Sequence, residues 1–251
     1  MFRFIMVFFT LLNLLPVIAQ QKFSVSFYGG YSLPLSDLKG DFPALSAGEK
    51  INFSSHPNYL TKEGFNFGAN FKYTYDSSAN GRLTAGIQTG SFSGRGEYSN
   101  LTYKNRLNIT TIYGGIEYII NPVSRYKAFI GAELTANFYS GRVEASGDTN
   151  FATNRKSETR YGLAIGTGVD IVISKSISLT LGAKYSMANM LGRATESSTN
   201  ASISDIPGDP QPFELKEIPL NDAETATNKS KSIHYIQLSI GFCYNFGGRA
   251  K

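Results

Sequence analysis

Hydrophobic and polar residues alternate along most of the chain beyond residue 22, and the alternation is clearest near the C-terminus. In residues 232–246 the odd-numbered positions are mostly small or polar. The even-numbered positions from 234 onward are His234, Ile236, Leu238, Ile240, Phe242, Tyr244 and Phe246. A side-chain period of two is typical of a β-strand. The run is also long enough, at about 9–11 residues or more, to cross a bilayer obliquely.

The same alternation recurs and predicts eight strands, with no helical periodicity between them. We place them at residues 22–32, 64–75, 82–92, 107–120, 126–139, 159–173, 177–190 and 232–246. Within 107–120, Leu107 and Ile109 fall on the opposite phase from Ile112 and Ile116. A β-bulge near Thr110-Thr111 would bring the two halves of this strand into one phase.

The connections between the strands alternate in length. Residues 76–81, 121–125 and 174–176 are short and rich in turn-forming residues, whereas the joins at about 33–63, 93–106, 140–158 and 191–231 are long. Short periplasmic turns opposite long external loops are typical of outer-membrane barrels. An even number of strands also places both termini of the chain on the side of the short turns.

The N-terminal residues resemble an export signal. Arg3 gives a positive start, residues 4–15 form an apolar stretch, and Val17-Ile18-Ala19 suits cleavage. The apolar stretch is shorter than the roughly 20 residues that a membrane-spanning helix needs. We therefore expect a signal peptide at 1–19 and a barrel domain at 20–251.

Two all-β folds compete, a soluble lipocalin-like barrel with an apolar interior and a membrane barrel with an apolar exterior. The polar face of the strands is dominated by Gly, Ser, Thr, Asn and Ala rather than by the charged residues of a solvated surface. Aromatic residues also flank both ends of the strands, as they do at two membrane interfaces. These are Tyr73, Tyr75, Tyr118, Tyr126, Tyr244 and Phe246 at one end, and Tyr31, Phe65, Phe138 and Tyr161 at the other. The prediction is an all-β, eight-stranded antiparallel transmembrane up-and-down β-barrel.

On this architecture and its final strand, the chain resembles the small OmpA/OmpX-like outer-membrane barrel families. The resemblance covers residues 22–246 and includes the alternating Phe242, Tyr244 and Phe246, which look like the families' C-terminal assembly signal. It implies insertion by the barrel-assembly machinery and residence in the cell outer membrane, among outer-membrane lipid. We expect no peptidoglycan-binding domain.

Several ionisable residues fall on the polar face, which would line the lumen. They are Lys72, Arg82, Glu117, Lys127, Glu133, Asp170 and Lys184. Counted from the short turns, Lys72, Glu117 and Asp170 lie at similar depth, with Glu133 and Lys184 farther along. Because isolated buried charges are costly, these residues should pair. Pairing within a packed lumen is our main interpretation, and a gated ion path is the alternative.

Catalytic and cofactor chemistry finds little support. Ser232 and His234 share one strand face, where a lipid-directed hydrolase could act, but we identify no carboxylate to complete a triad. His56 and His234 are the only histidines and have no zinc-ligand spacing. Cys243 is the only cysteine, and the net charge of +5 is dispersed rather than gathered into a nucleic-acid footprint. We expect no cofactor, no metal site and no nucleic-acid partner.

The sequence therefore predicts an exported, integral outer-membrane barrel with a structural or surface-interaction role, possibly as a subunit of an envelope assembly. Long external loops suit a protein or surface ligand. The alternatives are a narrow channel for ions or small solutes and, third, an outer-membrane lipid-modifying enzyme.

Overall fold

The computed structural model describes residues 22–41, 59–76, 78–98, 101–147, 150–174, 176–191 and 232–246. The expected signal peptide at 1–19 lies outside these ranges, as do most of the expected loops at 33–63 and 191–231. The strands are β1 (Lys22–Leu35), β2 (Glu63–Thr74), β3 (Gly81–Tyr98), β4 (Leu101–Ile119), β5 (Tyr126–Ser146), β6 (Phe151–Val172), β7 (Ile177–Leu191) and β8 (His234–Phe246). A short 3-10 helix, η1 (Ser36–Leu38), follows β1.

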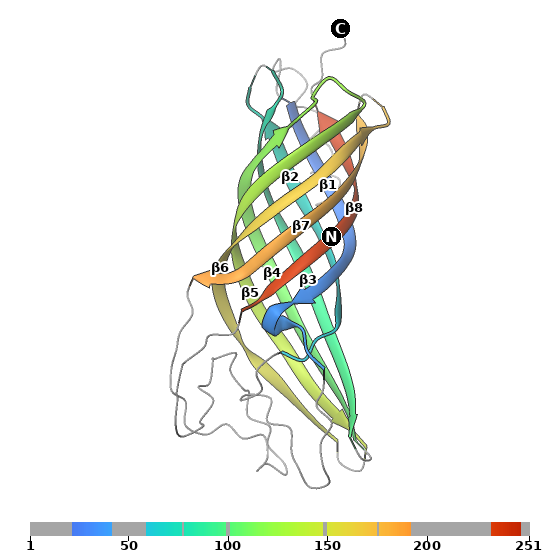
Figure 1. Ribbon diagram of the computed structural model, residues 1–251, viewed down its shortest axis with the longest axis vertical. Helices are drawn as coiled ribbons and strands as arrows, with labels where there is room; N and C mark the ends of the chain where they lie inside the picture. The colour runs from blue at the N-terminus through green and yellow to red at the C-terminus, as the bar shows by residue number, and fades with distance from the viewer. Residues whose placement is uncertain are drawn as a thin grey trace, which may run out of the picture.

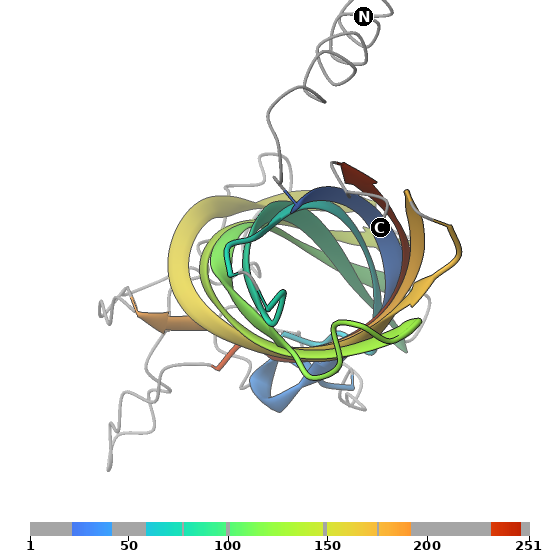
Figure 2. The ribbon, with the colours of Figure 1, turned by 90° about the horizontal axis from the view of Figure 1, so that it is seen from above.

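The eight strands form one closed ring. Each pairs antiparallel with its neighbours in sequence, and β1 pairs with β8 to close the barrel (Figure 2). This confirms the predicted eight-stranded up-and-down barrel. It is also the architecture of the small barrels that the sequence resembles. The short turns gather at the upper end of the barrel in Figure 1. Among the described residues, no helix is long and apolar enough to cross a membrane.

The apolar face of the strands points outward. Phe27, Phe67 and Phe242 are each more than 60% exposed, and so is Leu134. The inward face carries small residues where strands crowd together. At Gly86, for example, a Cβ atom would lie 2.5 Å from the carbonyl oxygen of Ala69 and 2.6 Å from the hydroxyl of Tyr113. Small inward side chains are what a narrow eight-stranded barrel needs.

Two of the predicted loops are largely strand, so their expected extents were wrong. β3 continues to Tyr98 and β4 begins at Leu101, which replaces most of the loop expected at 93–106. Likewise β5 ends at Ser146 and β6 begins at Phe151, within the loop expected at 140–158. These extensions run beyond the other strands at the lower end in Figure 1. The outward residues of the extensions of β3, β4 and β5 are polar, so the apolar repeat that marked these strands in the sequence ends before the strands do.

The bulge expected at Thr110-Thr111 is absent. β4 keeps one register with both β3 and β5 through these residues. Leu107 and Ile109 instead point into the barrel and are fully buried. The change of apolar phase in the sequence therefore marks an apolar stretch of the lumen, not a break in the strand. The register shifts lie elsewhere, at Tyr139/Gly141 between β5 and β6 and at Tyr161/Leu163 between β6 and β7.

Candidate functional site in the barrel lumen

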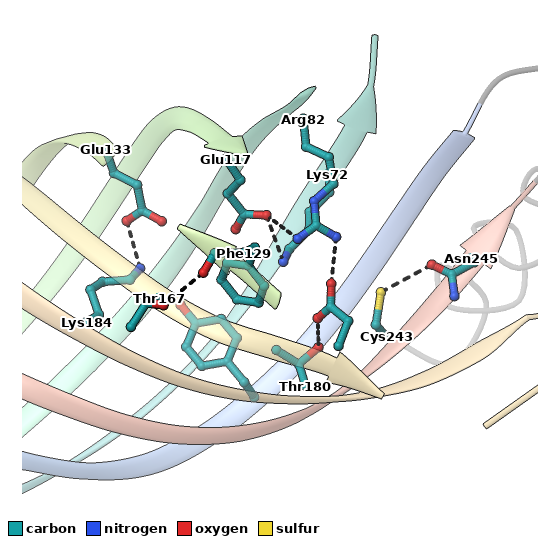
Figure 3. A network of polar contacts seen from close by, with 12 residues as sticks. Lys72, Arg82, Glu117, Phe129, Glu133, Thr167, Thr180, Lys184, Cys243 and Asn245 are labelled. Carbon is teal, nitrogen blue, oxygen red and sulfur yellow. Dashed lines mark hydrogen bonds and ion pairs between the residues drawn. The ribbon is translucent and has the colours of Figure 1, made fainter. Parts of the chain in front are cut away.

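A layer of paired charges crosses the lumen near the short turns. We call Lys72, Arg82, Glu117 and Asp170 the basal layer (Figure 3). Glu117 Oε2 lies 3.2 Å from Lys72 Nζ and 2.6 Å from Arg82 Nη2. Arg82 Nη1 lies 2.6 Å from Asp170 Oδ2. Since the four residues come from β2, β3, β4 and β6, the basal layer ties one wall of the barrel to the other.

The basal layer is charge-balanced and almost wholly buried. Its two cations face two carboxylates, and every side chain in it is less than 10% exposed. Thr180 Oγ1 donates a hydrogen bond to Asp170 Oδ1 at 2.6 Å, and the Phe129 ring lies 4.6 Å from Lys72 Nζ. Moving each ion out of water costs several kcal/mol, which only close pairing and further hydrogen bonds offset. Such a layer closes the lumen at this depth.

A second group of polar side chains lies deeper in the lumen. We call Glu133, Lys184, Tyr113, Tyr28, Gln88 and Gln237 the middle layer. Lys184 Nζ lies 2.7 Å from Glu133 Oε2 and 4.2 Å from the centre of the Tyr113 ring. The Tyr113 and Tyr28 hydroxyls are 3.1 Å apart, and Tyr28 donates to Gln88 Oε1 at 3.0 Å. The layer is completed by Gln88 Nε2, which donates to Gln237 Oε1 at 3.2 Å.

A small cavity of ≈ 70 Å³ lies in this part of the lumen, bordered by residues of both layers. Besides the ion-paired Glu117 Oε2, four buried polar atoms of its lining residues have no hydrogen-bond partner in the protein, namely Ser26 Oγ, Asn66 Oδ1, Asn70 Oδ1 and Gln237 Nε2. Buried polar groups in such positions are normally satisfied by water, and the volume is sufficient for it. The cavity is therefore suited to trapped water between the two layers.

The opposite end of the lumen is closed by apolar residues, which we call the outer cap: Leu38, Tyr59, Phe92, Leu107, Ile109, Tyr139, Ala188, Ile233 and Tyr235. The rings of Phe92 and Tyr235 lie 5.1 Å apart between centroids. The Tyr139 hydroxyl donates to the Ala188 carbonyl oxygen at 2.9 Å, which satisfies its polar end. All nine residues are less than 5% exposed, so the outer cap is densely packed.

Two segments between β1 and β2, residues 36–41 and 59–62, complete the outer cap. Thr61 Oγ1 donates to the Leu38 carbonyl oxygen at 2.6 Å, and Asn105 Nδ2 donates to the carbonyl oxygen of Tyr59. The Ser232 backbone N–H donates to Asp37 Oδ2 at 2.7 Å. These bonds hold Leu38 and Tyr59 against the inward side chains of the strands.

The structure brings most of the predicted lumen residues together. Lys72, Glu117 and Asp170 meet in the basal layer, and Glu133 meets Lys184 in the middle layer. Lys127 is half-buried and lies directly opposite Asp170 in the β5–β6 register. Of the residues expected to signal assembly, Phe242 and Tyr244 are exposed on the outer face, and the Tyr244 and Phe246 rings are 4.7 Å apart.

Sequence reasoning missed Tyr28, Gln88 and Tyr113, as well as the whole outer cap. The two tyrosines come from β1 and β4, and their meeting depends on the width of the lumen, which the alternation does not encode. The sequence did contain a signal for the outer cap. Phe92, Leu107 and Ile109 fall on the opposite strand face from the other large apolar residues of β3 and β4, and these two strands pair with each other.

Ser232 lies just before β8, and His234 is its first residue. The Tyr185 hydroxyl lies 2.9 Å from His234 Nδ1. The Ser232 backbone N–H donates to Asp37 Oδ2 at 2.7 Å. Within the described part of the chain, no group of three or more His, Cys, Asp or Glu residues could hold a metal ion.

Comparison with known proteins gives likeness in structure only. No family model and no curated protein matches the chain. Among solved structures, the chain is similar to Neisserial surface protein A (NspA), with 15% identity, coverage of 89% of this chain and 97% of that chain, and a TM-score of 0.47. It is also similar to a major outer membrane protein from Thermus thermophilus, with 13% identity, coverage of 90% and 100%, and a TM-score of 0.48. A third is the outer membrane protein OprG from Pseudomonas aeruginosa, with 11% identity, coverage of 92% and 99%, and a TM-score of 0.45.

Proposed function

We propose that the chain is an integral outer-membrane protein. The support comes from its own outer surface, where large apolar side chains on all eight strands are left exposed. A soluble protein rarely exposes a continuous apolar area of more than a few hundred Å². Tyr75, Tyr118 and Tyr126 are exposed beside the short turns, and Phe65 and Tyr161 are exposed toward the other end, as expected of two membrane interfaces.

The role proposed for the barrel is structural or surface-interacting, not transport. The observation that carries this is the filled lumen, in which the basal layer, the middle layer and the outer cap follow one another along the barrel. An open aqueous pore requires about 16–18 strands, whereas eight leave room only for side chains. The external end, where β3 to β6 extend beyond the belt, is then the part available to a protein or surface ligand, including an envelope assembly partner.

Export and insertion complete the proposal. A signal peptide at 1–19 would direct the chain out of the cytoplasm, and Phe242, Tyr244 and Phe246 would be read by the barrel-assembly machinery. The short turns would face the periplasm and the extensions of β3 to β6 the cell exterior, in keeping with the usual asymmetry of outer-membrane barrels.

Cysteine labelling of intact cells tests this placement. In a Cys243→Ser background, Glu97→Cys in the β3 extension should react with a membrane-impermeant thiol reagent. Ser124→Cys, in a short turn, should react only after the outer membrane is breached. Labelling in the opposite sense would invert the barrel, and equal labelling of both positions in a soluble fraction would overturn membrane integration.

A further inference from the structure

The outer face of the barrel carries a basic cluster just beyond the apolar belt. Lys62, Arg95, Lys104, Arg106 and Arg142, which we call the basic surface, line a cleft of ≈ 430 Å³ together with the carboxylates Glu63 and Glu144. The five cations are all exposed and lie on or beside β2, β3, β4 and β5. They point outward, because the alternate residues of the same strands, such as Phe92, Leu107 and Val143, are buried inside.

The register of these strands sets like charges directly against each other. Arg106 is the cross-strand partner of Arg142, and Arg95 is the partner of Lys104. Directly opposed side chains in an antiparallel pair have Cβ atoms only about 4.5–5.5 Å apart, and like charges there are destabilising. Two such pairs lie on three adjacent strands, so without a bound anion this surface carries electrostatic repulsion.

The carboxylates nearby compensate only in part. Arg142 Nε lies 2.9 Å from Glu144 Oε1, Arg95 pairs with Glu97 at 3.1 Å, and Lys62 pairs with Asp41 at 2.7 Å. These are solvent-exposed pairs, which contribute little. Within the described ranges, Lys104 and Arg106 make no ion pair, although Glu144 is the cross-strand partner of Lys104 on its other side. Because five cations line the cleft with only the two carboxylates Glu63 and Glu144, an excess of positive charge remains there.

The basic surface lies at a defined height above the apolar belt. Arg142 follows the exposed Phe138 by four residues, or about 13 Å along the strand and about 10 Å along the barrel axis once the strand tilt is included. Between belt and basic surface runs a row of hydrogen-bonding side chains, in which Ser91 pairs with Asn108 and Asn108 with Ser140. Apolar, hydroxyl or amide, and then cationic side chains thus follow one another outward from the membrane.

We propose that the basic surface binds the phosphate groups of a phosphorylated glycolipid in the outer leaflet. The inference rests on the proposed membrane placement. Phosphates would sit between the opposed cations, where guanidinium groups can bind them in a bidentate manner. The sugar hydroxyls would meet the row of Ser91, Asn108 and Ser140. A soluble polyanion fits less well, because the cations face sideways at headgroup height rather than toward the medium above the barrel.

Lipid retention in nanodiscs tests the proposal. The full chain is reconstituted in phosphatidylcholine nanodiscs containing either bisphosphorylated lipid A or the same lipid A with both phosphates removed, and bound lipid is measured by native mass spectrometry. The unmodified protein should retain the phosphorylated form about tenfold better. In the double variant Arg106→Gln/Arg142→Gln this preference should disappear. The control Lys39→Gln/Arg125→Gln, which removes the same charge from other exposed positions, should keep it.

A stability measurement separates binding from a structural role. In a neutral detergent, Arg106→Gln should leave the melting temperature unchanged or raise it, since a like-charge pair is removed. With phosphorylated lipid A present, the unmodified protein should gain stability and Arg106→Gln should gain less.

Equal retention of both lipids, or equal losses in the double variant and its control, would overturn the lipid site while leaving the membrane placement intact. Failure of the unmodified protein to enter nanodiscs as a heat-modifiable barrel would overturn the membrane placement, and the lipid site with it.

Discussion

The two ends of this lumen are closed by opposite chemistry. Near the short turns, Arg82 and its ionic partners fill the barrel with paired charge. At the far end, Phe92, Leu107 and Tyr235 fill it with mainly apolar side chains, and the buried amides of Asn105 and Asn137 bond to backbone carbonyls there. The basal layer is held by a few directional contacts, none of which can be lost without leaving a buried charge. The outer cap is held by many weak contacts, each of which can be lost separately.

The comparison also shows that polarity does not by itself identify the inward face of a barrel strand. Along β4, the inward positions run from Glu117 through Tyr113 to Ile109 and Leu107, all buried. The same strand face therefore changes from charged at Glu117 to apolar at Ile109 and Leu107. The two parts of this face differ in their surroundings. Glu117 lies among the ionic partners of the basal layer, whereas Leu107 and Ile109 lie among the apolar residues of the outer cap.

Loss of the central cation should break the basal layer and have the largest effect. Arg82→Gln leaves Glu117 with Lys72 as its remaining ionic partner and deprives Asp170 of its 2.6 Å contact. Removing one partner of a buried ionic group costs about 3–5 kcal/mol. Urea titration in lipid vesicles should report that loss in the free energy of unfolding. The exposed Arg125→Gln is the control, and similar small losses in both variants would contradict the account of the basal layer.

Truncation in the outer cap should cost somewhat less and should depend on which way the residue faces. Leu107→Ala opens a cavity in a region that is fully buried, with an expected loss of about 2–5 kcal/mol in the free energy of unfolding. Leu134→Ala is the matched control, because Leu134 is 70% exposed on the outer face, where lipid chains can fill the space. If Leu134→Ala were the more damaging of the two, Leu107 would not face a packed interior.

The middle layer should be the least sensitive of the three. Glu133→Gln keeps a hydrogen-bond acceptor beside Lys184 but removes the charge that balances it, at 2.7 Å. The two side chains are 10% and 18% exposed, so water reaches Lys184 more easily than it reaches Arg82. We expect a loss of about 1.5–3 kcal/mol in the same titration. A loss as large as that of Arg82→Gln would place Lys184 in surroundings as dry as the basal layer.

The sequence predicted the parts of this structure that depend on local alternation. It placed all eight strands and their outward face, and it set Lys72, Glu117 and Asp170 at similar depth. It did not predict the outer cap, because an apolar residue that faces the lumen looks in sequence like one that faces lipid after a phase shift. Nor did it predict the link between Tyr28 and Tyr113, which requires the diameter of the closed barrel.

The strand extensions were missed for a related reason. Beyond the belt, the outward positions of β3 and β4 carry Arg95, Lys104 and Arg106, so the apolar repeat fades although the backbone pairing continues. What looked like loop is paired strand whose outward side chains are polar, while alternate residues such as Phe92, Leu107 and Val143 are buried inside. The basic surface is visible only once the register sets Arg106 against Arg142.

The central claim, that opposite chemistries seal the two ends of one lumen, is tested most directly by single-channel recording in planar bilayers. The unmodified protein, shown to be inserted by heat-modifiable folding, should give a silent baseline across the accessible voltage range. Steady single-channel currents from the unmodified protein would contradict the claim, because they require a continuous aqueous path through the basal layer and the outer cap together.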